Sequence, residues 1–247
     1  MLVRQAYRYE LKPNNRERTL LAKHVGVARF AWNWALARRI ERFEKNQAKE
    51  RFTNAVADHR EWNEWKKENA PWWAEVSKCA PQETFRDLDR AFQNFWQGRK
   101  AARKVGIPKF KKKGVRDSCR FSTGAIKVLG SHVQLPRLGK IRVKETTAVR
   151  GRILSATISR EADRWFVSFT VEREREVETN RSTEAVGVDL GIDSFAVVSD
   201  GTKLESPRPL ERGLKRLRRL QKKHARKQKG SSNRRKSAVR FGRLHRR

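Results

Sequence analysis

The sequence is poor in cysteine, and the cysteines that it has are far apart. Cys79 and Cys119 form no Cys-x-x-Cys pair in the chain of 247 residues. This spacing excludes a disulfide framework and a zinc site with four cysteine ligands. It favours a reducing, intracellular setting.

Long hydrophobic runs are also missing. No stretch of the sequence approaches the ~20 apolar residues that a membrane-spanning helix requires. Residues 2–12 are charged throughout, so no secretory signal follows Met1. We therefore expect no membrane partner.

Acidic side chains are few relative to basic ones. The chain has 60 Lys and Arg against 27 Asp and Glu, a net charge of +33. So large an excess opposes compact folding through self-repulsion, and the phosphates of a nucleic acid would neutralise it. The chain is still not a disordered basic tail, because 37% of its residues are hydrophobic, which is enough for a core.

Hydrophobic periodicity predicts one strand followed by a helical block. Residues 2–11 alternate between apolar and polar side chains, as a half-buried strand does. The period then becomes helical, with Gly26 as the weak point of the first helix or helix pair and Pro81 as a break before the last helix. The predicted helices cover residues 16–45, 56–69 and 82–104.

Short strands punctuated by Gly and Pro are expected from Ser118 onward. Residues 153–171 predict a hairpin whose second strand has apolar side chains at alternate positions. Strands of this spacing indicate a small barrel or sandwich. Residues 2–11 could complete it, with the helical block as an insertion.

A polar linker at 177–184 is expected to precede a last unit that begins at Ala185. Strands are predicted on both sides of Asp193 and again after the turn at Gly201. After Pro209 the chain becomes helical and extremely basic.

Asp189 stands in the middle of the apolar segment "VGVDLGI", which predicts a central, buried strand. The burial of a carboxylate there costs free energy of desolvation unless the carboxylate is paired or binds a metal. Three interpretations fit this segment: the first carboxylate of an RNase H-like nuclease, which bridges two Mg²⁺ ions, the opening strand of an actin-like ATPase, and a structural Asp bonded to a backbone N–H. Gly187 and Gly191 leave room beside Asp189 for any of them.

The C-terminal basic segment argues against the ATPase. Residues 212–247 contain 17 Lys or Arg and no acidic residue. Leu214, Leu217 and Leu220 form one narrow apolar stripe, and the remaining surface is cationic, as suits a nucleic-acid duplex. The candidate nucleic-acid-binding residues of this segment are Lys215, Arg216, Arg219, Lys222 and Lys223.

Three segments in this order resemble one family. They are "YRYELKPNNRERTLLAKHVGVARFAWNWALARR", "KVGIPKFKKK" and the stretch from "AVGVDLGIDSFAVVSDG" to "KGSSNRRK". The combination is similar to the TnpB proteins, the accessory "transposases" of bacterial insertion sequences and relatives of the compact type V CRISPR effectors. The resemblance spans the whole chain.

The resemblance implies an α+β, multidomain fold. Residues 1–12 would be the first strand of a wedge β-barrel, which residues 106–180 complete. Residues 13–105 would be an inserted helical recognition lobe, called a helix-turn-helix region in older descriptions. Residues 181–247 would be the N-terminal part of an RNase H-like (RuvC) nuclease domain with its basic helices.

The resemblance also implies a function. TnpB proteins are RNA-guided DNA endonucleases that use Mg²⁺, so guide RNA and double-stranded DNA are the implied partners and the bacterial cytoplasm, near the nucleoid, the implied location. Asp189 matches the first RuvC carboxylate and metal ligand. The residues that match positions at the target-adjacent duplex are Lys78 and Gln82, with Ser122 and Thr123 near another such position. The residues that would lie along the nucleic acid are Lys109, Lys111, Lys112 and Lys113.

The family's second RuvC segment with its Glu, its four-cysteine zinc finger and its third segment with an Asp have no counterpart in these 247 residues. We therefore expect a truncated member that binds RNA and DNA but does not cleave alone, and whose last unit is the least stable, with an open edge and an apolar face. Two alternatives are an active nuclease completed from elsewhere and a nuclease-dead DNA-binding repressor. A basic ribosome-associated protein would not explain Asp189.

Overall fold

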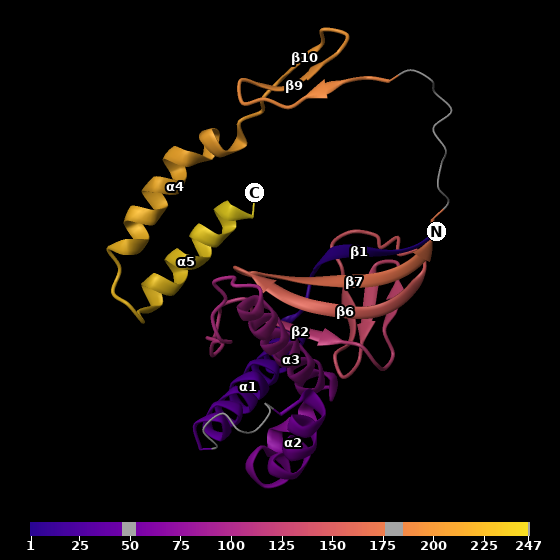
Figure 1. Ribbon diagram of the computed structural model, residues 1–247, viewed down its shortest axis with the longest axis vertical. Helices are drawn as coiled ribbons and strands as arrows, with labels where there is room; N and C mark the ends of the chain where they lie inside the picture. Colours follow the sequence, from indigo (N-terminus) through magenta and orange to yellow (C-terminus); the bar gives the residue numbers. More distant parts are fainter. Residues whose placement is uncertain (46–52, 176–184, 247) are drawn as a thin grey trace. The chain divides into compact units, whose positions relative to one another are not determined.

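The computed structural model describes residues 1–45, 53–175 and 185–246 (Figure 1). It divides into two compact units, Leu2–Glu174 and Met1 with Arg175–Arg247. The linker expected at 177–184 lies outside the described residues. Among the helices described, none combines the length and the apolarity needed to cross a bilayer.

Two antiparallel sheets form the β-part of the first unit. The larger sheet has the order β1-β7-β6-β2, and the smaller has the order β3-β4-β5. Their strands are β1 (Leu2–Leu11), β2 (Ser118–Phe121), β3 (Lys127–Leu129), β4 (His132–Leu135), β5 (Gly139–Arg142), β6 (Arg152–Glu161) and β7 (Arg164–Glu174).

The pairing of β1 with β7 agrees with the expectation that the first strand joins the later ones. The two sheets share one hydrophobic core and are linked by a bridge between Leu11 and Val143. The described strands are thus two sheets around a common core, and no continuous ladder closes them into a barrel. The predicted hairpin is confirmed, and its alternate residues Trp165, Val167, Phe169 and Val171 are buried.

The second unit contains a small sheet of order β10-β9-β8. Its strands are β8 (Val188–Asp189), β9 (Ser194–Val198) and β10 (Lys203–Glu205). The expectation of a central, buried strand around Asp189 is wrong for the described residues, because β8 is an edge strand of two residues and pairs on one side, with β9. A strand buried on both faces needs covering elements that this sheet lacks among the described residues. Ile192 is therefore 93% exposed.

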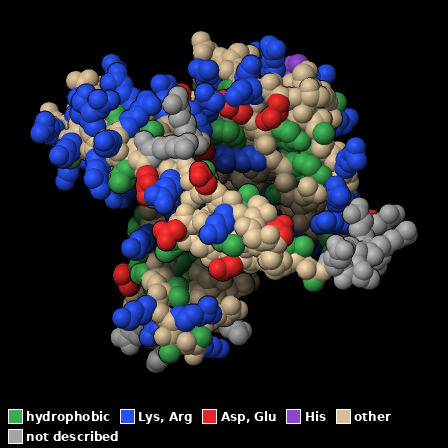
Figure 2. Space-filling model, turned by 90° about the horizontal axis from the view of Figure 1, so that it is seen from above, with side chains coloured by type: hydrophobic (Ala, Val, Ile, Leu, Met, Phe, Trp, Pro, Cys, Tyr) green, Lys and Arg blue, Asp and Glu red, His purple; other side chains and the backbone are tan. Residues whose placement is uncertain are grey.

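Two basic helices complete the second unit, α4 (Pro209–Ala225) and α5 (Ser232–His245). They pack against each other, and the ring of His224 stacks on that of Phe241. Leu214, Leu217 and Leu220 are half-buried, as the predicted stripe requires. Figure 2 shows a dense group of Lys and Arg side chains over these two helices.

The helical block of the first unit consists of α1 (Asn15–Lys45), α2 (Ala55–Asn69), the 3₁₀ turn η1 (Pro71–Glu75) and α3 (Cys79–Lys100). α1 continues through Gly26 as a single helix. The predicted break at Pro81 is wrong, because α3 begins at Cys79 and Pro81 lies in its first turn. Proline is tolerated there, since the first N–H groups of a helix have no intrahelical partner.

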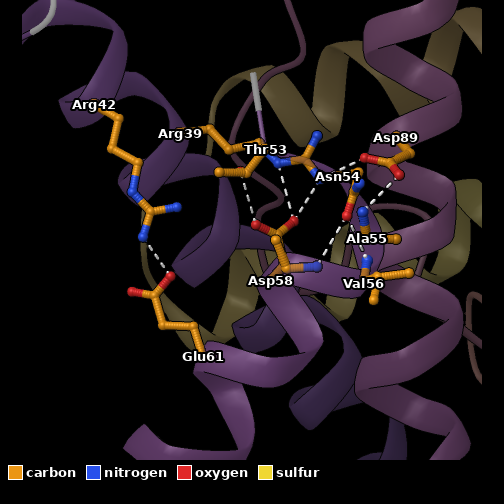
Figure 3. A network of polar contacts seen from close by, with 10 residues as sticks. Arg39, Arg42, Thr53, Asn54, Ala55, Val56, Asp58, Glu61 and Asp89 are labelled. Atoms are coloured by element: carbon orange, nitrogen blue, oxygen red, sulfur yellow. Dashed lines mark hydrogen bonds and ion pairs between the residues drawn. The ribbon is translucent and has the colours of Figure 1, made fainter. Parts of the chain in front are cut away.

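Arg39 joins the three helices of this block (Figure 3). Its guanidinium donates to Asp58 of α2, with 2.9 Å from Nε to Oδ2, and to Asp89 of α3. Asp89 also accepts the N–H of Ala55 at 2.6 Å, at the start of α2. The side chains of Arg39 and Asp58 are each 1% exposed. Burial raises the pKa of the Asp58 carboxyl, and its hydrogen bond from Arg39 opposes that rise.

Candidate nucleic-acid interface

The start of α3 and the loop after β2 come together at one junction. The loop is tied to Cys79, whose Sγ lies 3.5 Å from the carbonyl oxygen of Thr123 and 3.3 Å from its Oγ1. Ser122 donates from Oγ to Oε1 of Glu83 at 2.6 Å. The predicted residues at this junction are Lys78, Gln82, Ser122 and Thr123. They come from segments about 40 residues apart in the sequence and are joined by contacts of their immediate neighbours.

His24 of α1 bonds the segment that leads into α3 at this junction. Its Nε2 accepts the N–H of Ser77 at 3.1 Å, and its Nδ1 lies 2.8 Å from the carbonyl oxygen of Leu20. The N–H of Cys79 in turn donates to Oγ of Ser77 at 3.3 Å. Lys78 stands between these bonded residues with its side chain exposed, so its backbone is fixed while its charge faces solvent.

Gly124 allows the loop after Thr123 to turn. Its φ is +93°, in the region that favours glycine, and a Cβ added there would lie 2.8 Å from Cγ of Pro136. Two features therefore require glycine at position 124: its positive φ and the closeness of Pro136.

Glu83 is a buried carboxylate at the junction that the sequence analysis missed. It is 5% exposed, and its Oε1 also accepts from Nη1 of Arg86 at 2.7 Å. Arg120 lies 4.0 Å from its Oε2 and 3.4 Å from Oδ1 of Asp87. Nothing in the local pattern distinguishes Glu83 from Asp87 and Asp89, the half-buried acids of α3, because its partners Arg120 and Ser122 are distant in the sequence.

The basic loop after α3 is fastened to α1. Asn33 donates from Nδ2 to the carbonyl oxygen of Lys111 at 3.0 Å and accepts the N–H of Lys111 at 2.8 Å. Trp32 donates from Nε1 to the carbonyl oxygen of Lys109 at 3.0 Å. These anchors fix the backbone of the loop, and the exposed lysines of this segment are Lys104, Lys109, Lys112 and Lys113.

Lys111 is placed differently from the other predicted lysines of this loop. Its Nζ lies 3.9 Å from the centroid of the Trp32 ring, and its side chain is half-buried. Burial lowers the pKa of Lys111. The geometry therefore assigns it to packing against α1 through a cation–π contact.

The predicted cations of α4 are Lys215, Arg216, Arg219, Lys222 and Lys223, and all are exposed. The end of α4 is held by Arg234 of α5, whose Nη1 donates to the carbonyl oxygens of Lys227 at 2.7 Å and His224 at 3.3 Å. Carbonyls at a helix end lack intrahelical partners, so these bonds stabilise the hairpin. α4 thus exposes a row of positive charges, and its C-terminal end is held in place by α5.

Asp189 is exposed on β8, and its backbone pairs with Val197. Within the described parts of the chain, no group of three or more His, Cys, Asp or Glu side chains could hold a metal ion. A two-metal nuclease site needs several carboxylates around the ions. The described residues do not fit such a site, and no catalytic step follows from them.

Comparison with known proteins first gives a class, that of insertion-sequence transposases. A family model described as "Probable transposase", OrfB_IS605, matches residues 168–247. A second model of the same series, described as "Helix-turn-helix domain", matches residues 1–48. Two models of the OrfB_IS605 type thus match the two ends of the chain, residues 1–48 and 168–247.

The chain is similar over 98% of its length to named relatives. It is 32% identical to a protein of Escherichia coli (strain K12) whose name describes an RNA-guided DNA endonuclease, InsQ. It is 34% identical to a protein of Mycobacterium tuberculosis (strain CDC 1551 / Oshkosh) and 30% identical to one of Streptomyces pristinaespiralis, with names of the same kind. The chain spans 58% of the first relative and 60% of the other two.

The fold is similar to that of several solved structures, one of which is a nucleic-acid complex. It is the cryo-EM structure of a Cas12f1–sgRNA–target DNA complex, matched with a TM-score of 0.50 over 99% of this chain and 75% of that chain. The identity is 10%, so the likeness concerns the fold alone.

Proposed function

We propose that this chain is a TnpB-type nucleic-acid-binding protein, associated with DNA transposition, that binds a guide RNA and double-stranded DNA and does not cleave by itself. The observation that carries the proposal is the basic loop after α3, whose backbone is fixed by Trp32 and Asn33 while Lys109, Lys112 and Lys113 face solvent. A fixed loop binds phosphates with little loss of conformational entropy. The net charge of +33 supplies the attraction.

Each part of the chain has a proposed role. The two sheets of the first unit would form the wedge and the helices α1 to α3 the recognition lobe. The junction would contact the target-adjacent duplex through Lys78, Gln82, Ser122 and Thr123. The guide RNA would recognise the target sequence by base pairing. The second unit would be the beginning of the RuvC domain, with α4 along the nucleic acid. We place this activity in the bacterial cytoplasm, near the nucleoid.

A second candidate is an RNA-guided endonuclease whose remaining carboxylates come from elsewhere. It is favoured by the exposed apolar residues around Asp189 and by the open side of β8, which further strands could cover. Asp189 would then be the first Mg²⁺ ligand. A nuclease-dead, guide-dependent repressor would use the same surfaces as the primary proposal.

The test uses the full chain purified with co-expressed RNA. We expect guide-dependent binding of a matching duplex and no cleavage in Mg²⁺. Cleavage that Asp189→Ala abolishes would replace the proposal with the endonuclease. Binding that weakens steeply with salt and does not depend on the guide sequence would contradict the proposal and indicate nonspecific electrostatic binding.

Replacing the cations of α4 separates specific from electrostatic binding. Changing Lys215, Arg216 and Arg219 to Gln removes three charges, so the slope of log affinity against log salt should become less steep by roughly 2 to 3 units. The double variant Lys127→Gln and Lys140→Gln, on the small sheet of the first unit, is the control. An unchanged slope in the triple variant would remove α4 from the interface.

A further inference from the structure

The buried carboxylate of Glu83 fixes the direction in which the Ser122 hydroxyl hydrogen points. The distance from Oγ of Ser122 to Oε1 of Glu83 is 2.6 Å, the length of a hydrogen bond to a charged acceptor. Arg86 donates to the same carboxylate oxygen at 2.7 Å. Oε1 of Glu83 thus accepts from both neighbours, and Ser122 is the donor of its bond.

A hydroxyl group has one hydrogen and two lone pairs. The single hydrogen of Ser122 is used by Glu83, and the side chain of Ser122 is half-buried, so part of it still faces solvent. Toward a ligand it therefore offers lone pairs only. The neighbouring loop is held by Cys79 and Gly124, which keeps Ser122 in this position.

We infer that Ser122 is an acceptor-only contact that selects an amino group on the edge of a base pair, and that Glu83 is the positioning residue that imposes this choice. In the major groove the amino donors are N6 of adenine and N4 of cytosine, whereas guanine and thymine present acceptors there. The junction is thus expected to prefer adenine or cytosine at one position of the bound strand. This inference rests on the proposed contact of the junction with duplex DNA.

Selection from a randomised pool tests the base preference. The full chain with its co-purified RNA is mixed with short duplexes that carry a randomised segment, and bound duplexes are sequenced. We expect the wild type to enrich a motif with adenine or cytosine at one position. Ser122→Ala should lose the preference at that position alone.

The removal of a single amino group tests the chemistry. In the enriched duplex, the adenine or cytosine is replaced by the analogue without its exocyclic amino group, purine or 2-pyrimidinone. The wild type should bind the analogue about tenfold more weakly, the lower end of the discrimination that a good base contact gives. Ser122→Ala should bind both duplexes equally.

Glu83→Gln tests the positioning role. An amide both donates and accepts, so the Ser122 hydroxyl regains the freedom to donate and the preference should relax toward guanine and thymine. Glu68→Gln, an exposed acid of α2, is the matched control and should keep the motif. Ser122→Ala keeps the test valid if Glu83→Gln lowers stability.

The outcomes separate this inference from the proposed function. A wild type that enriches no motif overturns the proposed duplex contact, and the inference with it. A motif that survives Ser122→Ala, or a wild type that binds the amino-free analogue equally well, overturns the inference alone.

Discussion

His24 is a buried side chain whose hydrogen bonds require a neutral ring. Nδ1–H donates to the Leu20 carbonyl, which leaves Nε2 as the acceptor of the Ser77 N–H. Burial lowers the pKa of His24, and the bond to Leu20 opposes this to a lesser extent. Protonation would turn Nε2 into a donor and break the bond to Ser77.

A pH dependence of stability follows at this residue. Because the folded pKa of His24 lies below the unfolded value of about 6.5, its contribution is fully present above that pH and is lost as pH falls toward the folded pKa. Urea unfolding of the wild type at pH 7.5 and 5.5 should show a loss of up to about 1.4 kcal/mol per pH unit. The loss should be smaller in His24→Gln and unchanged in the control His132→Gln. Equal slopes in His24→Gln and wild type would contradict this role.

Arg39 acts at the scale of elements, because it joins α1 to α2 and α3. In Arg39→Met the Asp58 carboxylate is left buried without its cation, and the free energy of unfolding should fall by about 3–5 kcal/mol. Arg42→Met is the control, since its pair with Glu61 is 39% and 30% exposed and should be worth about 1 kcal/mol or less. Denaturant unfolding measures both. A similar loss in the two variants would show that the burial of Arg39 is not what matters.

The conformation of the basic loop after α3 depends on Asn33, which bonds the loop to α1. Asn33→Ala removes both of its bonds to the Lys111 backbone, so the loop should become more mobile while α1 stays folded. We expect faster proteolysis within residues 104–117 and weaker RNA binding by a few fold, roughly the effect of one or two lost hydrogen bonds. Asn69→Ala, whose side chain bonds within its own helix, should leave both unchanged. Unchanged cleavage in Asn33→Ala would show that the loop is held by other contacts.

The whole molecule has two units of different character. The first has an extensive core, whereas in the second Val188 of β8 and the flanking Val186 and Leu190 are exposed. Few buried contacts mean a low free energy of local opening. Amides of residues 186–205 should therefore exchange hydrogen faster than those of β6 and β7 in the free chain, as mass spectrometry would show. Comparable protection in both units would contradict the expected weakness of the second.

Local pattern explains what could be predicted in the first unit. The strand at 2–11, the hairpin with Trp165 and Phe169, and the helix over 56–69 are encoded by neighbours in the chain. The predicted break at Pro81 is wrong, because a proline breaks a helix only past its first turn. The prediction of a central strand at Asp189 is wrong, because the burial of a strand depends on neighbouring elements, which a run of apolar residues does not supply by itself.

The sequence by itself led to the proposed class of partner and to the order of strands and helices, because net charge and periodicity are properties of the linear chain. It also named Lys78, Gln82, Ser122 and Thr123 through a resemblance. Only the tertiary structure decided which contacts hold the predicted residues in place. Glu83 bonds to Ser122, 39 residues away in the sequence, and Asn33 bonds to Lys111, 78 residues away. Contacts over such separations leave no periodic trace in a sequence, so they become visible only when the chain is folded.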